Sequence, residues 1–174
     1  AVSMDGEIEC WGNDENDEAD PLQDNDWVQV DSGKDHSCAL NWAGEIHCWG
    51  KDNNDRTDSH DGPFDTLHLG KEFTCGHTPG ERPVCWGKDD EEQIYPPELP
   101  LEAMSAGDKH ACGIDHTGAL HCWGKEDDDR IEPPGGVFTL IAVGGNHACA
   151  LDTDGQLQCW GKSNHDQTTP PTAP

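Results

Sequence analysis

The strongest constraint on the fold of this chain is a short phrase, Cys-Trp-Gly, which recurs at an almost constant interval along the 174 residues. The tryptophans of its five copies are separated by steps of 38, 37, 37 and 37 residues, at Trp11, Trp49, Trp86, Trp123 and Trp160. Periods of about 20 to 50 residues are typical of solenoids, propellers and other repeat arrays. We therefore expect one repeat domain over residues 1–174, divided approximately into 1–37 (partial), 38–74, 75–111, 112–148 and 149–174 (partial).

Each copy of the phrase ends a predicted β-hairpin. Between Cys38 and Cys48 the sequence reads "ALNWAGEIH", two strand-like runs on either side of a turn that contains Gly44. Pairing the two cysteines across the hairpin places Leu40 opposite Ile46 and leaves a three-residue loop with glycine where a left-handed conformation is usual.

A further strand precedes each hairpin. Two apolar columns align among the copies, one formed by Trp27, Phe64, Leu101 and Phe138 and the other by Val30, Leu67, Met104 and Ile141. The connections between repeats are polar and contain prolines, as in "KEDDDRIEPPGG", which excludes a continuing helix. No useful length of the chain shows the apolar period of a helix. The sequence predicts an all-β array with three to four short antiparallel strands in each repeat of about 37 residues.

The pattern Gly-x-x-His-x-Cys-Ala-Leu, a glycine turn and then Cys-Trp-Gly resembles the bacterial and extracellular branch of the regulator-of-chromosome-condensation repeats, which build β-propellers. The resemblance implies about five blades. Members of this class include the nucleotide-exchange factor of the GTPase Ran and a secreted bacterial β-lactamase inhibitor, and both work by protein contact. Where the family commonly has a glycine before glutamine, this chain has an acid, at Asp17, Asp55, Glu92, Asp129 and Asp166.

The nine cysteines are best explained as hairpin disulfides. A zinc site repeated in every copy would need constant ligands, but Val84 and Gln158 stand where His47 stands in another copy. Disulfides explain four pairs with one spacing of ten residues: Cys38 with Cys48, Cys75 with Cys85, Cys112 with Cys122, and Cys149 with Cys159. Disulfides persist in oxidising compartments, so the sequence predicts an extracellular protein, secreted or on a cell surface.

Cys10 is left without a partner at the same spacing, because the partner would stand immediately before Ala1. Three explanations remain open. The sequence is part of a longer array, a neighbouring subunit supplies the missing strand in an intermolecular contact, or the ring of repeats is open at one seam.

The net charge of the chain argues against some classes of partner. The chain has 36 acidic and 10 basic residues, a formal net charge of −26, which argues against nucleic acid and anionic lipid. No stretch is long and apolar enough to predict a membrane span. The acids gather in the loop after each Trp-Gly, so Ca²⁺ is a candidate ligand although no cofactor is required. Its predicted ligands are Asp17, Asp55, Glu92, Asp129 and Asp166, with Asp52, Asp89 and Asp127 as neighbours.

Catalysis is not predicted. Histidine recurs at one column, at His36, His110 and His147, where packing beside the cysteine is expected, and no nucleophile or phosphate-binding motif accompanies it. Trp42, on a hairpin turn, is the aromatic residue that we expect to contact a partner. We expect a secreted, non-enzymatic propeller that binds a protein or glycan. The alternative is a structural subunit that joins copies of itself head to tail in an extracellular fibre or sheath.

Overall fold

The computed structural model describes residues 1–12, 14–21, 23 and 26–170, and within these it contains twelve β-strands and no helix. The strands are β1 (Trp27–Ser32), β2 (His36–Asn41), β3 (Ile46–Gly50), β4 (Thr66–Leu69), β5 (Phe73–His77), β6 (Val84–Gly87), β7 (Ala103–Ala106), β8 (His110–Ile114), β9 (Leu120–Gly124), β10 (Phe138–Val143), β11 (His147–Asp152) and β12 (Leu157–Gly161). In this part of the chain no helix has the length and apolar character needed to cross a membrane.

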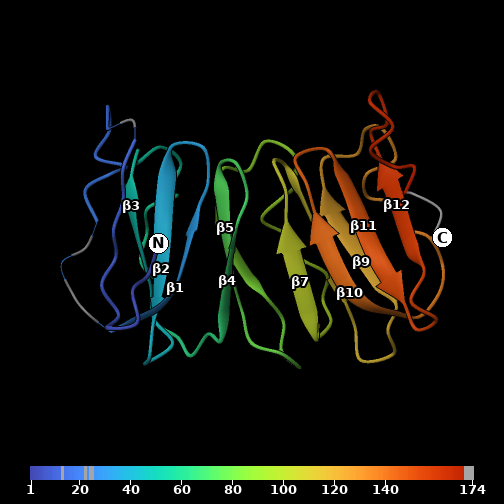
Figure 1. The fold of residues 1–174 in the computed structure, drawn as a ribbon, viewed down its shortest axis with the longest axis horizontal. Helices are drawn as coiled ribbons and strands as arrows, with labels where there is room; N and C mark the ends of the chain where they lie inside the picture. The colour runs from blue at the N-terminus through green and yellow to red at the C-terminus, as the bar shows by residue number, and fades with distance from the viewer. Residues whose placement is uncertain (13, 22, 24–25, 171–174) are drawn as a thin grey trace.

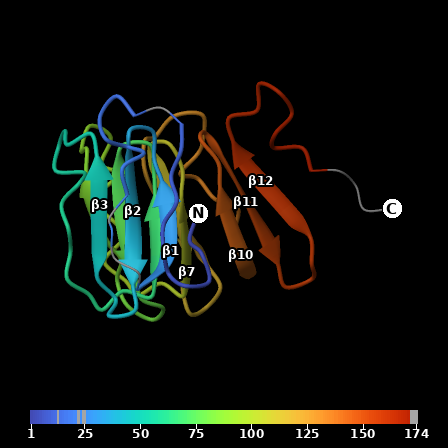
Figure 2. The ribbon, with the colours of Figure 1, turned by 60° about the vertical axis from the view of Figure 1, so that its left-hand side comes forward.

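The strands form four antiparallel sheets of three, in the orders β1-β2-β3, β4-β5-β6, β7-β8-β9 and β10-β11-β12. We call these sheets blades 1 to 4. Figure 1 shows the blades side by side along the long axis, and Figure 2 shows the sheets turned relative to one another, with blade 4 at the end that leads to the C-terminus. The prediction of an all-β repeat array with propeller-like blades is confirmed.

The predicted hairpin register is also confirmed. Cys38 pairs with Cys48 and Leu40 with Ile46. The equivalent cysteines pair in the other three blades, and the equivalents of Leu40 and Ile46 pair in blades 3 and 4. All four predicted disulfides are present, with Cα atoms 4.0 to 4.1 Å apart. This short separation is that of a non-hydrogen-bonded antiparallel pair, so the disulfide joins the positions where facing side chains lie closest.

Neighbouring blades bury apolar side chains against each other. At the junction of blades 1 and 2, Leu40 and Ile46 pack with Leu67 and Trp86. The middle strands β2, β5 and β8 are buried along their whole length. A blade covers each face of β5 and β8, whereas the second face of blade 1 packs against the N-terminal residues Val2 and Ile8. Core formation in this molecule therefore takes place between blades rather than within one.

A row of main-chain hydrogen bonds also joins the four blades at the turns after their first strands. The amide of Lys34 donates to the carbonyl of Lys71 (3.0 Å), that of Lys71 to Asp108 (3.1 Å) and that of Asp108 to Gly145 (3.2 Å). Each turn begins with a glycine, at a place where the ring of the histidine or phenylalanine three residues later lies close to the main chain. A Cβ atom on Gly70 would lie 2.0 Å from the ring of Phe73.

The two ends of the array differ in how they are covered. A short bridge between Val2 and Ile8 forms beside blade 1, and both side chains pack in the cluster that contains Trp27 and Trp49. At the other end, β11 alternates between buried and partly exposed residues, because only one of its faces has a neighbouring blade among the described residues. Leu157 is 45% exposed.

Candidate functional site: the acidic face

The loops that follow β3, β6, β9 and β12 lie at one end of the blades. Each loop is held to the turn before the middle strand of its own blade, since Lys51 donates its amide to Asp35 and Lys88 donates to Glu72 (2.8 and 2.9 Å). The same bond recurs in blades 3 and 4. These four loops, residues 51–56, 88–93, 125–130 and 162–167, form what we call the acidic face.

The acids that replace the usual glycine adopt the left-handed backbone conformation in every loop. Their φ angles lie between 56° and 60°, at Asp17, Asp55, Glu92, Asp129 and Asp166. Each of these residues accepts a main-chain hydrogen bond from the residue three positions later. Aspartate tolerates this conformation better than most residues with a side chain. These loops therefore adopt a left-handed conformation at a position where this chain has an acid and no glycine.

In the loops of blades 1 to 3, the residue after the left-handed acid anchors the loop in the blade junction. Arg56 and Arg130 are only 2% and 3% exposed, and Gln93 is also buried. The indole N–H of Trp123 donates to the carbonyl of Gln93 (3.0 Å), and that of Trp160 donates to the carbonyl of Arg130 (3.1 Å). In blades 3 and 4 the tryptophan of the Cys-Trp-Gly phrase thus holds the acidic loop of the preceding blade, whereas the indole nitrogen of Trp86 has no hydrogen-bond partner among the described residues.

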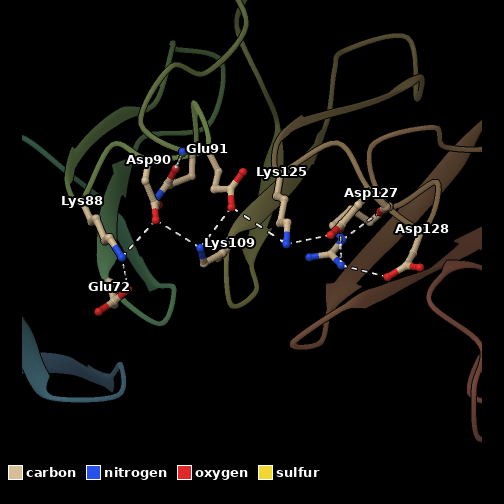
Figure 3. Close-up of polar contacts among 10 residues, drawn as sticks. Glu72, Lys88, Asp90, Glu91, Lys109, Lys125, Asp127 and Asp128 are labelled. Atoms are coloured by element: carbon tan, nitrogen blue, oxygen red, sulfur yellow. Dashed lines mark hydrogen bonds and ion pairs between the residues drawn. The ribbon is translucent and has the colours of Figure 1, made fainter.

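Lysines link the acids of neighbouring blades into one polar ladder (Figure 3). Lys88 contacts Glu72 (2.9 Å) and Asp90 (3.0 Å), while Lys109, from the next blade, contacts Asp90 and Glu91 (both 3.1 Å). The ladder continues from Glu91 through Lys125 to Asp127, which also pairs with Arg130. This ladder was not predicted from the sequence, although lysine follows Trp-Gly in four copies, at Lys51, Lys88, Lys125 and Lys162.

The ladder stabilises the charged form of its members. Partial burial opposes ionisation of Asp90, but hydrogen bonds from Gln93, Lys88 and Lys109 hold the pKa of this carboxyl well below its usual range. The hydrogen bond to Glu91 raises the pKa of Lys109. The acidic face therefore combines fixed ion pairs with unpaired carboxylates, among them those of Asp52 and Glu126, which are exposed.

The predicted metal ligands are distributed one to a loop. Asp17, Asp55, Glu92, Asp129 and Asp166 belong to different loops, and their neighbour Asp127 is engaged by Lys125 and Arg130. Across the described ranges, no group of three or more His, Cys, Asp or Glu side chains is placed to hold a metal ion. Calcium binding stays a prediction, to be tested in solution.

Two of the three recurring histidines, His36 and His110, are buried between blades, whereas His147 in blade 4 is partly exposed. His36 is 1% exposed, and its Nε2 atom lies 3.1 Å from the hydroxyl of Thr74. Burial lowers the pKa of His36 and of His110 to about 4, so both rings are neutral at pH 7. His77 is not at the recurring histidine position, so its burial was not predicted from the sequence. It is buried as well, and its Nε2 atom lies 3.0 Å from the carbonyl oxygen of Leu101.

Two further sequence candidates lie away from the acidic loops. Trp42 is 82% exposed on the hairpin between β2 and β3, at the opposite end of blade 1. Cys10 is half-buried beside blade 1 and forms no disulfide with any described residue. Burial raises the pKa of its thiol.

Comparison with protein families gives a match to the regulator of chromosome condensation (RCC1) repeat at residues 27–56, 102–129 and 138–167. These three segments cover slightly more than half of the chain. No curated protein sequence matches the chain.

Solved structures show the same architecture. The ectodomain of the receptor kinase CR4 from Physcomitrella patens is 30% identical, with a TM-score of 0.68 over 79% of this chain and 40% of that chain. The ectodomain of ACR4 from Arabidopsis thaliana is 28% identical, with a TM-score of 0.65 over 78% of this chain and 50% of that one. Prp20p from Saccharomyces cerevisiae, studied for its binding to Gsp1p and histones, has a TM-score of 0.67 at 17% identity over 79% and 45% of the chains, a likeness of fold alone. The chain spans 40 to 50% of the length of these proteins.

Proposed function

Because the chain belongs to the RCC1 repeat family, we propose that it is an extracellular, non-enzymatic binding module that presents its acidic face to a protein partner. The observation that carries this proposal is the polar ladder, in which lysines of blade 3 join the acidic loop of blade 2 to that of blade 3. A net charge of −26 favours a partner with a basic surface. The disulfide in each blade and the likeness to two receptor ectodomains support the extracellular location.

The proposal is tested by charge reversal on the acidic face. Asp52→Lys with Glu126→Lys changes two exposed carboxylates outside the ladder. Glu81→Lys with Asp154→Lys is the matched control, since it changes the net charge equally at the hairpin end of the blades. The protein is immobilised, extracellular proteins of its source are applied, and retained proteins are quantified by mass spectrometry. We expect the first variant to lose a partner that the control retains, and equal retention by both would contradict the proposal.

A second candidate function is self-assembly into a fibre or sheath, favoured by the face of blade 4 that has no neighbouring blade among the described residues. Leu157 is 45% exposed there and Leu140 is 62% exposed, whereas Ile46, which occupies the position of Leu157 in blade 1, is 0% exposed. Non-closing contacts between copies produce filaments. Light scattering over a range of concentrations checks this function. Particle mass that rises with concentration and falls on Leu157→Glu supports assembly, and a monomer at all concentrations excludes it.

A further inference from the structure

The outer edge of blade 2 presents main-chain groups that nothing in the described part of the chain pairs. Cys75 and Cys85 form a non-hydrogen-bonded pair, with Cα atoms 4.1 Å apart. In such a pair the N–H and C=O groups point away from the partner strand. The main chain of Cys85 therefore faces outward from β6, and no main-chain hydrogen bond from another described segment reaches it.

Blade 1 shows that this kind of edge accepts a further strand. Ile46 in β3 exchanges two hydrogen bonds, both 2.9 Å, with His60 in the connection to blade 2. The ring of His60 lies 4.0 Å from that of Trp86, between ring centroids, which fixes the added segment against the next blade. The outer edge of blade 1 is thus occupied by the chain itself.

The residue of blade 2 that is equivalent to Ile46 is Pro83, which has no N–H to donate. The connection after blade 2 pairs instead with the hairpin, where the amide of Leu101 donates to Glu81 (3.0 Å). This path leaves the edge of β6 uncovered beside a groove of about 420 Å³.

The groove offers apolar contact next to the free edge. Its lining includes Arg82, Pro83, Val84, Ile94, Tyr95 and Pro96. Val84 is 45% exposed and Tyr95 is 60% exposed, although both are apolar over most of their surface. The hydroxyl of Tyr95 donates to Asp89 (2.8 Å), which holds the ring in a defined position.

The charge around the groove is mostly negative. Glu98 lines it and pairs with Arg82 (2.8 Å), and the carboxylate of Asp89 accepts the hydrogen bond of the lining residue Tyr95. A basic ligand would complement these carboxylates and the net charge of −26. We propose that the edge of β6 binds an extended, basic peptide segment by strand addition, with ligand amides on Cys85 and an apolar ligand side chain against Val84 and Tyr95. This inference goes beyond the proposed function, because the groove lies on the rim of blade 2, outside the acidic loops.

The test uses the peptide acetyl-Lys-Val-Lys-Val-Lys-amide as the probe and isotope-labelled protein for amide chemical shifts. We expect saturable shifts at the amides of residues 84–87. Tyr95→Ala should weaken binding about tenfold, as loss of one aromatic contact predicts. Trp11→Ala is the control, because it removes a tryptophan that is exposed away from the groove and should leave the affinity unchanged.

A second peptide separates strand addition from charge attraction. Methylation of the valine amide nitrogens keeps the charge and side chains but removes donors, and we expect it to weaken binding at least tenfold. Equal binding of the methylated peptide, shifts centred on another strand, or no saturable binding would each overturn the proposal. The Asp52→Lys, Glu126→Lys variant should bind the probe within twofold of the unmodified protein. A failure of the acidic-face function therefore leaves this test unaffected.

Discussion

Some polar side chains buried between the blades have no hydrogen-bond partner among the described residues, which lowers the free energy of unfolding. A single substitution can remove such a group. His110 is fully buried, and neither of its ring nitrogens has a hydrogen-bond partner among the described residues. In blade 2 the same position is Phe73, which packs with Ala111, and Ala148 is the equivalent alanine opposite His110. We expect His110→Phe to raise the free energy of unfolding by about 1 kcal/mol at pH 7, because it removes buried polar atoms that lack partners. Chemical denaturation measures this change.

The control for this exchange is His36→Phe, because His36 bonds Thr74 across the junction. That variant would leave the threonine hydroxyl without its partner, so its stability should rise less than that of His110→Phe. A loss of stability in His110→Phe would mean that the ring makes a polar contact that the structure does not contain.

The buried histidines also predict acid sensitivity. Burial lowers the pKa of His36, His68 and His110 from an ordinary value of 6.5 to about 4. Between these two values the unfolded chain binds protons that the folded chain does not, so stability is complete above about pH 6.5 and falls as the pH decreases to about 4. Melting temperatures measured from pH 7 to 4 check this. In His110→Phe the fall should be smaller, and an unchanged pH profile would contradict the assignment.

At the scale of the element, the disulfide hairpin is the main local stabiliser. Replacing Cys112 and Cys122 by serine opens a link over ten residues, and we expect a loss of about 2 to 3 kcal/mol in unfolding free energy. Cys10→Ser is the control, because Cys10 has no disulfide among the described residues. Non-reducing peptide mapping identifies the four bridges. Equal stability of both variants would show that the hairpin holds without its bridge.

The hairpins were predictable because their signal is local and repeated. Spacing alone placed Cys38 opposite Cys48 and Leu40 opposite Ile46, as observed. The acidic ladder was not predictable in this way, because Lys109 contacts acids 18 and 19 residues earlier, across a blade junction whose geometry no short motif encodes. The burial of His77 depends on the same junctions.

The positive φ angles of the left-handed acids could not be predicted from the sequence for a different reason. Glutamate at Glu92 argues against a positive φ on steric grounds, yet the loop imposes it. Tertiary anchoring by the buried residue that follows, Gln93, decides the turn. The local steric preference of glutamate alone predicts a negative φ at Glu92.

For the whole molecule, the net charge of −26 makes cations the simplest variable to test. If the acidic loops bind calcium as predicted from their composition, CaCl₂ should raise the melting temperature more than NaCl of the same ionic strength, because a bound ligand stabilises by mass action. MgCl₂ serves as the control for divalent screening. Equal shifts with all three salts would show that the loops respond to screening alone.

The row of main-chain hydrogen bonds from Lys34 to Gly145 makes the array a one-dimensional cooperative system. In such a system each unit is coupled only to its nearest neighbours, so a disturbance decays with distance counted in units. Blade 4 has one described neighbour, and its middle strand is correspondingly less buried than β5 or β8. Amide hydrogen exchange should therefore be fastest in β11 and slowest in β5 and β8. Unfolding then begins at one terminal blade and moves inward, which leaves the central blades as the last ordered part of the molecule.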